Sequence, residues 1–161
     1  MFKKNFERKD RRPVAANPNE EKFEERVLQI KRTTKKTSGG SKIGFNALIL
    51  LGNKKGMIGT GLGKASDVQT AVQKAVSAAR RSMIKVNISG DTISYPVEEK
   101  YGSAKIILKP APEGTGIIAG GSVRTVVELV GIKNISGKML GSNNKICNVK
   151  CTINALKKLR S

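Results

Sequence analysis

One short segment of this chain has the glycine and lysine of a phosphate-binding loop. Gly63 is followed by Lys64, as in the loop that wraps nucleotide phosphates in many hydrolases. That loop also needs an earlier glycine, where this sequence has Ile58, and a serine or threonine to hold magnesium, where it has Ala65. We therefore predict no nucleotide hydrolysis at this segment.

A second glycine-rich segment, residues 113–121, has the spacing of two other chemistries. Its Gly114-x-Gly116-x-x-Ala119 pattern fits a loose dinucleotide fingerprint, but Glu128 is the last acidic residue, so no carboxylate lies about 20 residues on to bind a ribose. Gly120-Gly121-Ser122 begins like a nucleophile elbow, but Arg124 replaces its last glycine. The chain has no histidine, the commonest general base. We predict no catalytic residue, no metal and no cofactor.

The charge of the chain indicates a different kind of chemistry. Its 161 residues include 31 Lys and Arg against 12 Asp and Glu, a formal charge of +19. Residues 1–86 have 20 basic and 7 acidic residues (+13), and residues 87–161 have 11 and 5 (+6). Such a charge indicates a polyanionic partner, and we expect nucleic acid. Because only 4% of residues are aromatic, we expect recognition of RNA backbone and shape rather than base stacking.

Cysteine usage and hydropathy limit where the protein works. Cys147 and Cys151 lie four apart with no second pair to complete a zinc site, so we expect reduced core residues in a reducing compartment. No apolar run approaches the ~20 residues that span a bilayer, and we expect a soluble protein without membrane contact. Glu7 and Asp10 interrupt the basic residues 1–12, which disfavours an organelle transit peptide and favours the cytoplasm.

The N-terminal half contains strand and helix patterns that would position these cations. We expect a flexible basic arm over residues 1–19, a short helix over 20–26, and strands over 27–36 and 42–52, the second with alternating apolar residues. The glycine-rich turn between the strands is flanked by Arg32, Lys35 and Lys36, and we favour RNA contact there over a solvated loop.

A third strand and a helix follow. Gly59, Gly61 and Gly63 share one face of the strand, which predicts close approach of a helix or of a phosphate chain, and both alternatives stay open. Ser66 and Gln69 form a capping-box pattern before an apolar stripe that ends near Arg81. Arg80, Arg81 and Lys85 suit either the negative helix end or an external phosphate.

A second compact unit is expected to begin near residue 87. We predict strands over 92–100 and 103–109, a glycine-rich turn, an apolar helix ended by Gly131, and a final helix over 143–159. The predicted fold class is α+β.

Several motifs together resemble one family. Lys35-Lys-Thr-Ser-Gly-Gly40, Gly59-Thr-Gly-Leu-Gly-Lys-Ala65 and the block over residues 109–121 followed by Arg124 are similar to bacterial-type ribosomal small-subunit protein five. The later Leu140-Gly-Ser-Asn-Asn144 also fits, and the resemblance runs from about residue 23 to residue 159. The family usually has a basic residue after Gly40, where this sequence has Ser41 and then Lys42.

The resemblance implies both architecture and partners. It implies an N-terminal domain (20–86) like the double-stranded RNA-binding fold, with a helix, a three-stranded antiparallel sheet and a helix, and a C-terminal two-layer α/β domain (87–161). It implies small-subunit ribosomal RNA, the neighbouring small-subunit proteins four and eight, and messenger RNA where it enters the subunit. It also implies a role in decoding accuracy, with residues 32–41 against RNA of the neck near an aminocyclitol antibiotic site.

Charge clustering and the resemblance together define the candidate contacts. The predicted RNA contacts are Arg32, Lys35, Lys36, Gly39, Gly40, Lys42, Lys54, Lys55, Lys64, Arg80, Arg81 and Lys85. The predicted partner-protein contacts are Gly114, Thr115, Gly116, Gly120, Gly121 and Arg124. Two rivals have no motif in their favour: a free RNA-binding regulator outside the ribosome, and an enzyme that uses the Gly114 loop.

Overall fold

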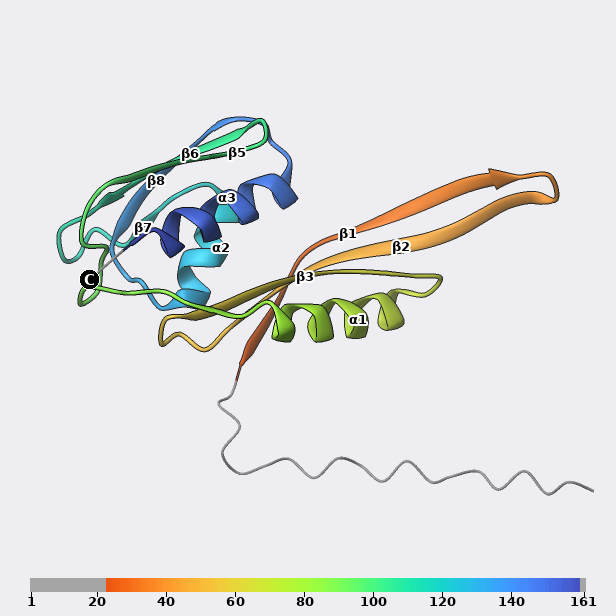
Figure 1. Ribbon diagram of the computed structural model, residues 1–161, viewed down its shortest axis with the longest axis horizontal. Helices are drawn as coiled ribbons and strands as arrows, with labels where there is room; N and C mark the ends of the chain where they lie inside the picture. Colours follow the sequence, from red (N-terminus) through yellow and green to blue (C-terminus); the bar gives the residue numbers. More distant parts are fainter. Residues whose placement is uncertain (1–22, 160–161) are drawn as a thin grey trace, which may run out of the picture.

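The computed structural model describes residues 23–159, which form two four-stranded sheets and three helices (Figure 1). The first sheet has the order β1-β2-β3-β4, with β1 at Glu24–Thr37, β2 at Gly40–Gly52, β3 at Met57–Ala65 and β4 at Ile84–Lys85. Helix α1, Val68–Arg81, packs on one face of this sheet. Within the described residues no helix is long and apolar enough to cross a membrane.

The helix predicted over residues 20–26 is wrong where the structure describes it. Glu24, Glu25 and Arg26 open strand β1 and pair with residues 50–52 of β2. These charged residues have good helix propensity, but they adopt the strand conformation that pairs with β2, because tertiary pairing outweighs a weak local preference. Residues 20–22, like the expected arm over 1–19, lie outside the described part of the chain.

The glycines of β3 make room for α1. A Cβ atom built on Gly61 would lie 2.5 Å from the Ala79 nitrogen and closer still to the Ala75 carbonyl oxygen, and Gly63 has the same relation to Ala71 and Ala75. Of the two alternatives for this glycine row, the structure supports helix packing. The helix begins one residue later than the capping-box pattern predicts, because the side chain of Asp67, not Ser66, accepts the Gln69 N–H at 3.0 Å.

Strand β2 is buried on both faces along its inner half, where the alternating pattern predicts burial on one. Ala47, Ile49 and Leu51 pack with α1, whereas Leu50 belongs to the core of the second unit, which is formed by the second sheet and its helices, described next. The inner half of β2 is therefore sandwiched between α1 and the second unit, while the outer half, from Gly40 to Ile43, is exposed.

The second sheet has the order β5-β6-β8-β7, with β5 at Val97–Tyr101, β6 at Ala104–Pro110, β7 at Ile117–Ile118 and β8 at Ile135–Gly141. Helices α2 (Gly121–Val130) and α3 (Lys145–Lys157) cover one face (Figure 1). The strand predicted over 92–100 begins only at Val97, and the sequence patterns missed β7 and β8. Gly131 ends α2 with φ 100°, as predicted.

The two units meet at the β2–β3 turn. The Lys54 N–H donates to the Leu129 carbonyl at 3.0 Å and the Gly56 N–H donates to that of Val130 at 2.9 Å. Gly131 leaves space for the Lys54 backbone. Leu50 and Ile58 of the first sheet lie fully buried in the same core as α2 and α3, so one core joins the two sheets.

Replacing Leu50 tests this shared core. We expect Leu50→Ala to lower the free energy of unfolding by about 2–5 kcal/mol, because the side chain is fully buried and leaves a cavity. Chemical denaturation measures the loss. Leu140→Ala is the matched control: that side chain is 38% exposed, and its loss should change stability far less. Equal losses in the two variants would contradict a shared core.

Cys147 and Cys151 form no disulfide. Cys151 is buried in α3 and its thiol donates to the Glu99 carbonyl at 3.2 Å, whereas Cys147 is half-buried. Burial, and secondarily the Glu99 carboxylate, raises the pKa of the Cys151 thiol. Among residues 23–159, no group of three His, Cys, Asp or Glu side chains could hold a metal.

Candidate nucleic-acid interface

The β1–β2 hairpin extends well past the N-terminal end of α1 as a two-stranded arm (Figure 1). From Ile30 to Ile43 every residue is exposed. Residues 27–66 include eight Lys and Arg and no Asp or Glu. The arm and the adjoining strands β2 and β3 therefore carry cations and no acidic residue over this range, and such a surface attracts a phosphate backbone.

The strand register gathers four lysines on one face of the first sheet. Lys64 alternates with Gly63, which faces α1, so Lys64 faces the other side. Lys31, Asn46 and Lys64 are cross-strand partners in one row. Neighbouring strands lie about 4.8 Å apart, so the row spans about 10 Å.

A second row continues this surface toward the hairpin tip. Lys35 pairs directly with Lys42, on the same face as Lys31. We call Lys31, Lys35, Lys42 and Lys64 the lysine face. Like charges in direct cross-strand register destabilise a hairpin, and an external anion between them would remove that cost.

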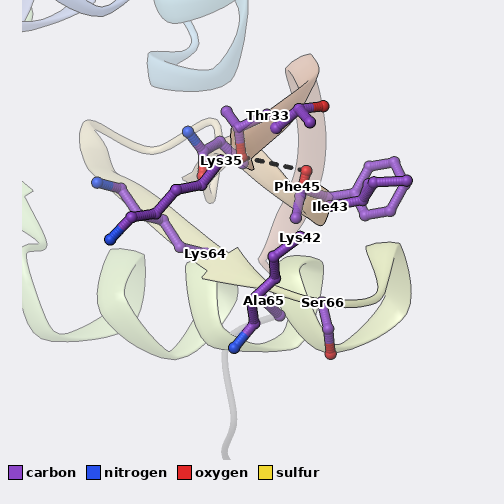
Figure 2. A pocket seen from close by; sticks show the side chains of 11 residues that line it. Thr33, Lys35, Lys42, Ile43, Phe45, Lys64, Ala65 and Ser66 are labelled. Carbon is purple, nitrogen blue, oxygen red and sulfur yellow. Dashed lines mark hydrogen bonds between the residues drawn. The ribbon is translucent and has the colours of Figure 1, made fainter. Parts of the chain in front are cut away.

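A groove of about 360 Å³ opens where the hairpin separates from the end of β3. Lys35, Lys42 and Lys64 line it together with Ile43 and Phe45 (Figure 2). The Thr33 hydroxyl donates to the Gly44 carbonyl at 3.2 Å and ties the two strands of the arm together beside the groove. Cations beside apolar surface suit a sugar-phosphate chain.

The other face of the hairpin is also basic. Arg32 pairs with Phe45, and Lys36 pairs with Ser41, on the α1 side of the sheet but beyond the helix. Gly40 has φ 128° at the tip, and a Cβ on Gly39 would meet no atom within 4 Å. The predicted contacts of the hairpin therefore form one arm with cations on both faces.

The remaining predicted contacts lie elsewhere and have different surroundings. Lys54 lies in the β2–β3 turn, and its ammonium pairs with Glu24 at 2.5 Å, so this residue contributes to the junction of the units. Lys55 is its exposed neighbour. Arg80 and Arg81 lie in the last turn of α1, and Lys85 lies in β4.

Sequence reasoning missed two cations of this region. Lys31 is absent from the predicted contacts. Lys31 and Lys35 are four residues apart on one strand and therefore share a face, so the alternation of side chains along the strand could have identified Lys31. Lys74 lies on the outer face of α1 in a groove that Lys64 and Arg81 also line. No sequence pattern shows that α1 runs beside Lys64.

The glycine-rich loop before α2 is held at one side and open at the other. The buried Asn134 accepts the Gly116 N–H at 3.1 Å. Gly114 and Gly116 have φ 86° and 72°, with nothing within 4 Å of a built Cβ. Thr115 donates its N–H to the Pro112 carbonyl at 3.3 Å.

The two glycines at the start of α2 have different surroundings. A side chain on Gly120 would clash with Met139, whereas a side chain on Gly121 would meet nothing. Arg124 donates to Glu128 at 2.8 Å, so its charge is paired within the helix.

The Glu24–Lys54 pair gives a pH prediction. The hydrogen bond from Lys54, and then that from Arg26, lowers the pKa of the Glu24 carboxyl. Because this pKa is lower in the folded than in the unfolded state, the pair stabilises the fold above the unfolded pKa, and the contribution is lost as pH falls through the folded pKa. We expect Lys54→Ala to raise the pKa of Glu24 toward its ordinary value in a carbon-13 NMR titration. Lys55→Ala is the control and should leave it unchanged; equal effects would contradict the pairing.

The fold and the surface define a basic α+β protein with two sheets, whose exposed cations suit a polyanionic partner. Residues 23–87 match the family described as ribosomal protein S5, N-terminal domain, and residues 99–161 match ribosomal protein S5, C-terminal domain. The chain is 52% identical over 140 residues to small ribosomal subunit protein uS5c of Cyanidium caldarium, covering 86% of this chain and 83% of that one. It is 50% identical over 142 residues to small ribosomal subunit protein uS5 of Campylobacter jejuni strain 81-176, covering 88% and 97%. The chain belongs to the ribosomal protein S5 family.

Proposed function

We propose that this chain is a structural component of the small subunit of a bacterial-type ribosome in the cytoplasm, where it binds ribosomal RNA without catalysing a reaction. The lysine face is the observation that carries the proposal: three strands bring four cations to one surface, opposite the helix that completes the core. The relatives named as small-subunit proteins support the same role.

We further propose that the first unit, residues 20–86, acts as an RNA-binding module related to the double-stranded RNA-binding fold. The antiparallel β1-β2-β3 sheet with α1 on one face supports that relation. The arm then contacts RNA of the subunit neck and supports decoding accuracy where messenger RNA enters. Its exposed cations and the absence of acidic residues over 27–66 support this placement.

We propose a protein contact for the second unit, residues 87–161. The loop from Gly114 to Gly121 is fixed through Asn134 yet has open space around three of its glycines, which suits close approach of another backbone. The neighbouring small-subunit proteins four and eight are the proposed partners. The paired Arg124 contributes hydrogen-bonding surface there rather than a free charge.

Sedimentation of a gentle lysate through a sucrose gradient in magnesium buffer tests the proposed function. We expect the chain to migrate with small subunits and to stay with them through a moderate salt wash. Recovery only at the top of the gradient would contradict a ribosomal role and would favour a free RNA-binding regulator.

A further inference from the structure

Strand β3 has an open edge. Strand β4 pairs only with Met57 and Ile58, so from Gly59 to Ala65 no strand among residues 23–159 pairs with the outer side of β3. Open edges of this kind are templates for another strand, and proteins guard them with charged residues. Lys64 is such a residue, and its positive charge favours an incoming strand that carries negative charges.

The backbone groups of this edge can be assigned from Ser82. Its hydroxyl donates to the Thr60 carbonyl at 2.6 Å and accepts the Thr60 N–H at 3.3 Å, so both groups of Thr60 point away from β2. Because successive residues of an antiparallel strand point their backbone groups to opposite sides, those of Leu62 and Lys64 also face outward. The edge therefore offers two N–H donors and two carbonyl acceptors beyond Ser82.

A groove of about 570 Å³ runs between this edge and the outer face of α1. Its cations are Lys64, Lys74 and Arg81, and no acidic residue lines it. Leu62 also lines the groove and is 43% exposed, so it is an apolar side chain that an incoming strand would cover.

We propose that this groove binds an extended, acidic segment of another protein, which adds to the first sheet as a strand beside β3. Phosphate oxygens only accept hydrogen bonds, so a phosphate chain along this edge would leave the outward carbonyls of Leu62 and Lys64 without donors, whereas a peptide strand satisfies donors and acceptors together. Acidic side chains match the three cations along the groove.

The basic residues at the start of this chain do not suit such a strand. Its residues 1–19 contain six basic and two acidic residues, the wrong sign for the groove. A second copy of β3 would place Lys64 against the same three cations. The expected partner is therefore a different protein, and the groove shares Lys64 and Arg81 with the predicted RNA contacts.

Nuclear magnetic resonance on the full nitrogen-15-labelled chain tests the proposal, with a short blocked peptide of alternating glutamate and valine as the probe. We expect the amide protons of Leu62 and Lys64 to shift and to exchange more slowly, because they become donors to the added strand. A peptide of the same sequence that is N-methylated at every residue keeps the charges but cannot donate, and it should not bind. Equal binding of the two peptides would overturn strand addition.

Charge variants and an RNA competitor complete the test. We expect Lys74→Glu with Arg81→Glu to weaken peptide binding about tenfold, since two exposed charge pairs are lost. Lys100→Glu with Lys138→Glu, which changes the net charge equally at a distant sheet, should leave it unchanged. Equal weakening in both double variants, or binding of a uridine oligonucleotide to the Leu62 and Lys64 amides in preference to the peptide, would overturn the proposal.

Discussion

Gly61→Ala is expected to break the packing of α1 on the first sheet. The added Cβ would lie 2.5 Å from the Ala79 nitrogen and closer to the Ala75 carbonyl oxygen. Both obstacles are backbone atoms of the helix, so no side chain can rotate away and α1 itself must move. We expect the free energy of unfolding to fall by about 3 kcal/mol or more, the upper end of what overpacking costs. Chemical denaturation monitored by circular dichroism measures the loss.

Gly39→Ala is the matched control for this substitution. Gly39 lies at the hairpin tip, has no atom within 4 Å of a built Cβ and lacks a positive φ, so an alanine there meets neither a clash nor strain. Its stability should remain close to that of the original chain. If Gly61→Ala were as stable as Gly39→Ala, the close approach of α1 to β3 would be wrong.

The glycine row of β3 shows which part of the packing the sequence alone predicts. Three glycines on one face of a strand indicate that something approaches closely, and this follows from local geometry. Whether a helix or a phosphate chain approaches depends on where the following segment packs. The alanines at 71, 75 and 79 complement the row, but one amphipathic stripe does not state which sheet face it covers.

The helix prediction at the N-terminal end of β1 was wrong for a different reason. Glu24, Glu25 and Arg26 have helix propensities, and nothing nearby marks them as a strand. Their conformation is set by β2, whose backbone they pair with about 25 residues further along the chain. Strand β8 was missed because its Ile-Ser-Gly-Lys-Met-Leu-Gly sequence contains two glycines and alternates weakly.

The sequence predicts those candidate site residues whose basic side chains lie close together along the chain. The hairpin cations are close in sequence, and they form one arm. Lys64 joins them only through the β2–β3 register, which pairs it with Asn46, and the β1–β2 register adds Lys31 to the same row. Lys54 has the same local appearance as Lys55, yet its ammonium pairs with Glu24 at the junction of the units. Pairing across strands is a tertiary property that a one-dimensional charge pattern does not contain.

Removing the lysine face is expected to have the largest effect on RNA binding. In the variant with Lys31, Lys35, Lys42 and Lys64 all replaced by alanine, about four phosphate contacts are lost, which lowers the slope of log affinity against log salt by about 3. At about 0.1 M salt this corresponds to about thousandfold weaker binding of small-subunit ribosomal RNA. Filter binding across a salt series measures both quantities. Exposed lysines contribute little to folding, so thermal unfolding of the variant should change little.

A variant with Lys100, Lys105, Lys109 and Lys138 replaced by alanine separates local contact from net charge. It also lowers the formal charge from +19 to +15, but its four lysines lie on the second sheet or at its end. If long-range attraction alone held the RNA, the two quadruple variants would lose affinity equally, because they carry the same net charge. If the cross-strand rows hold phosphates directly, only loss of the lysine face removes the salt dependence of those contacts. Equal slopes in the two variants would therefore contradict the lysine face as the RNA contact.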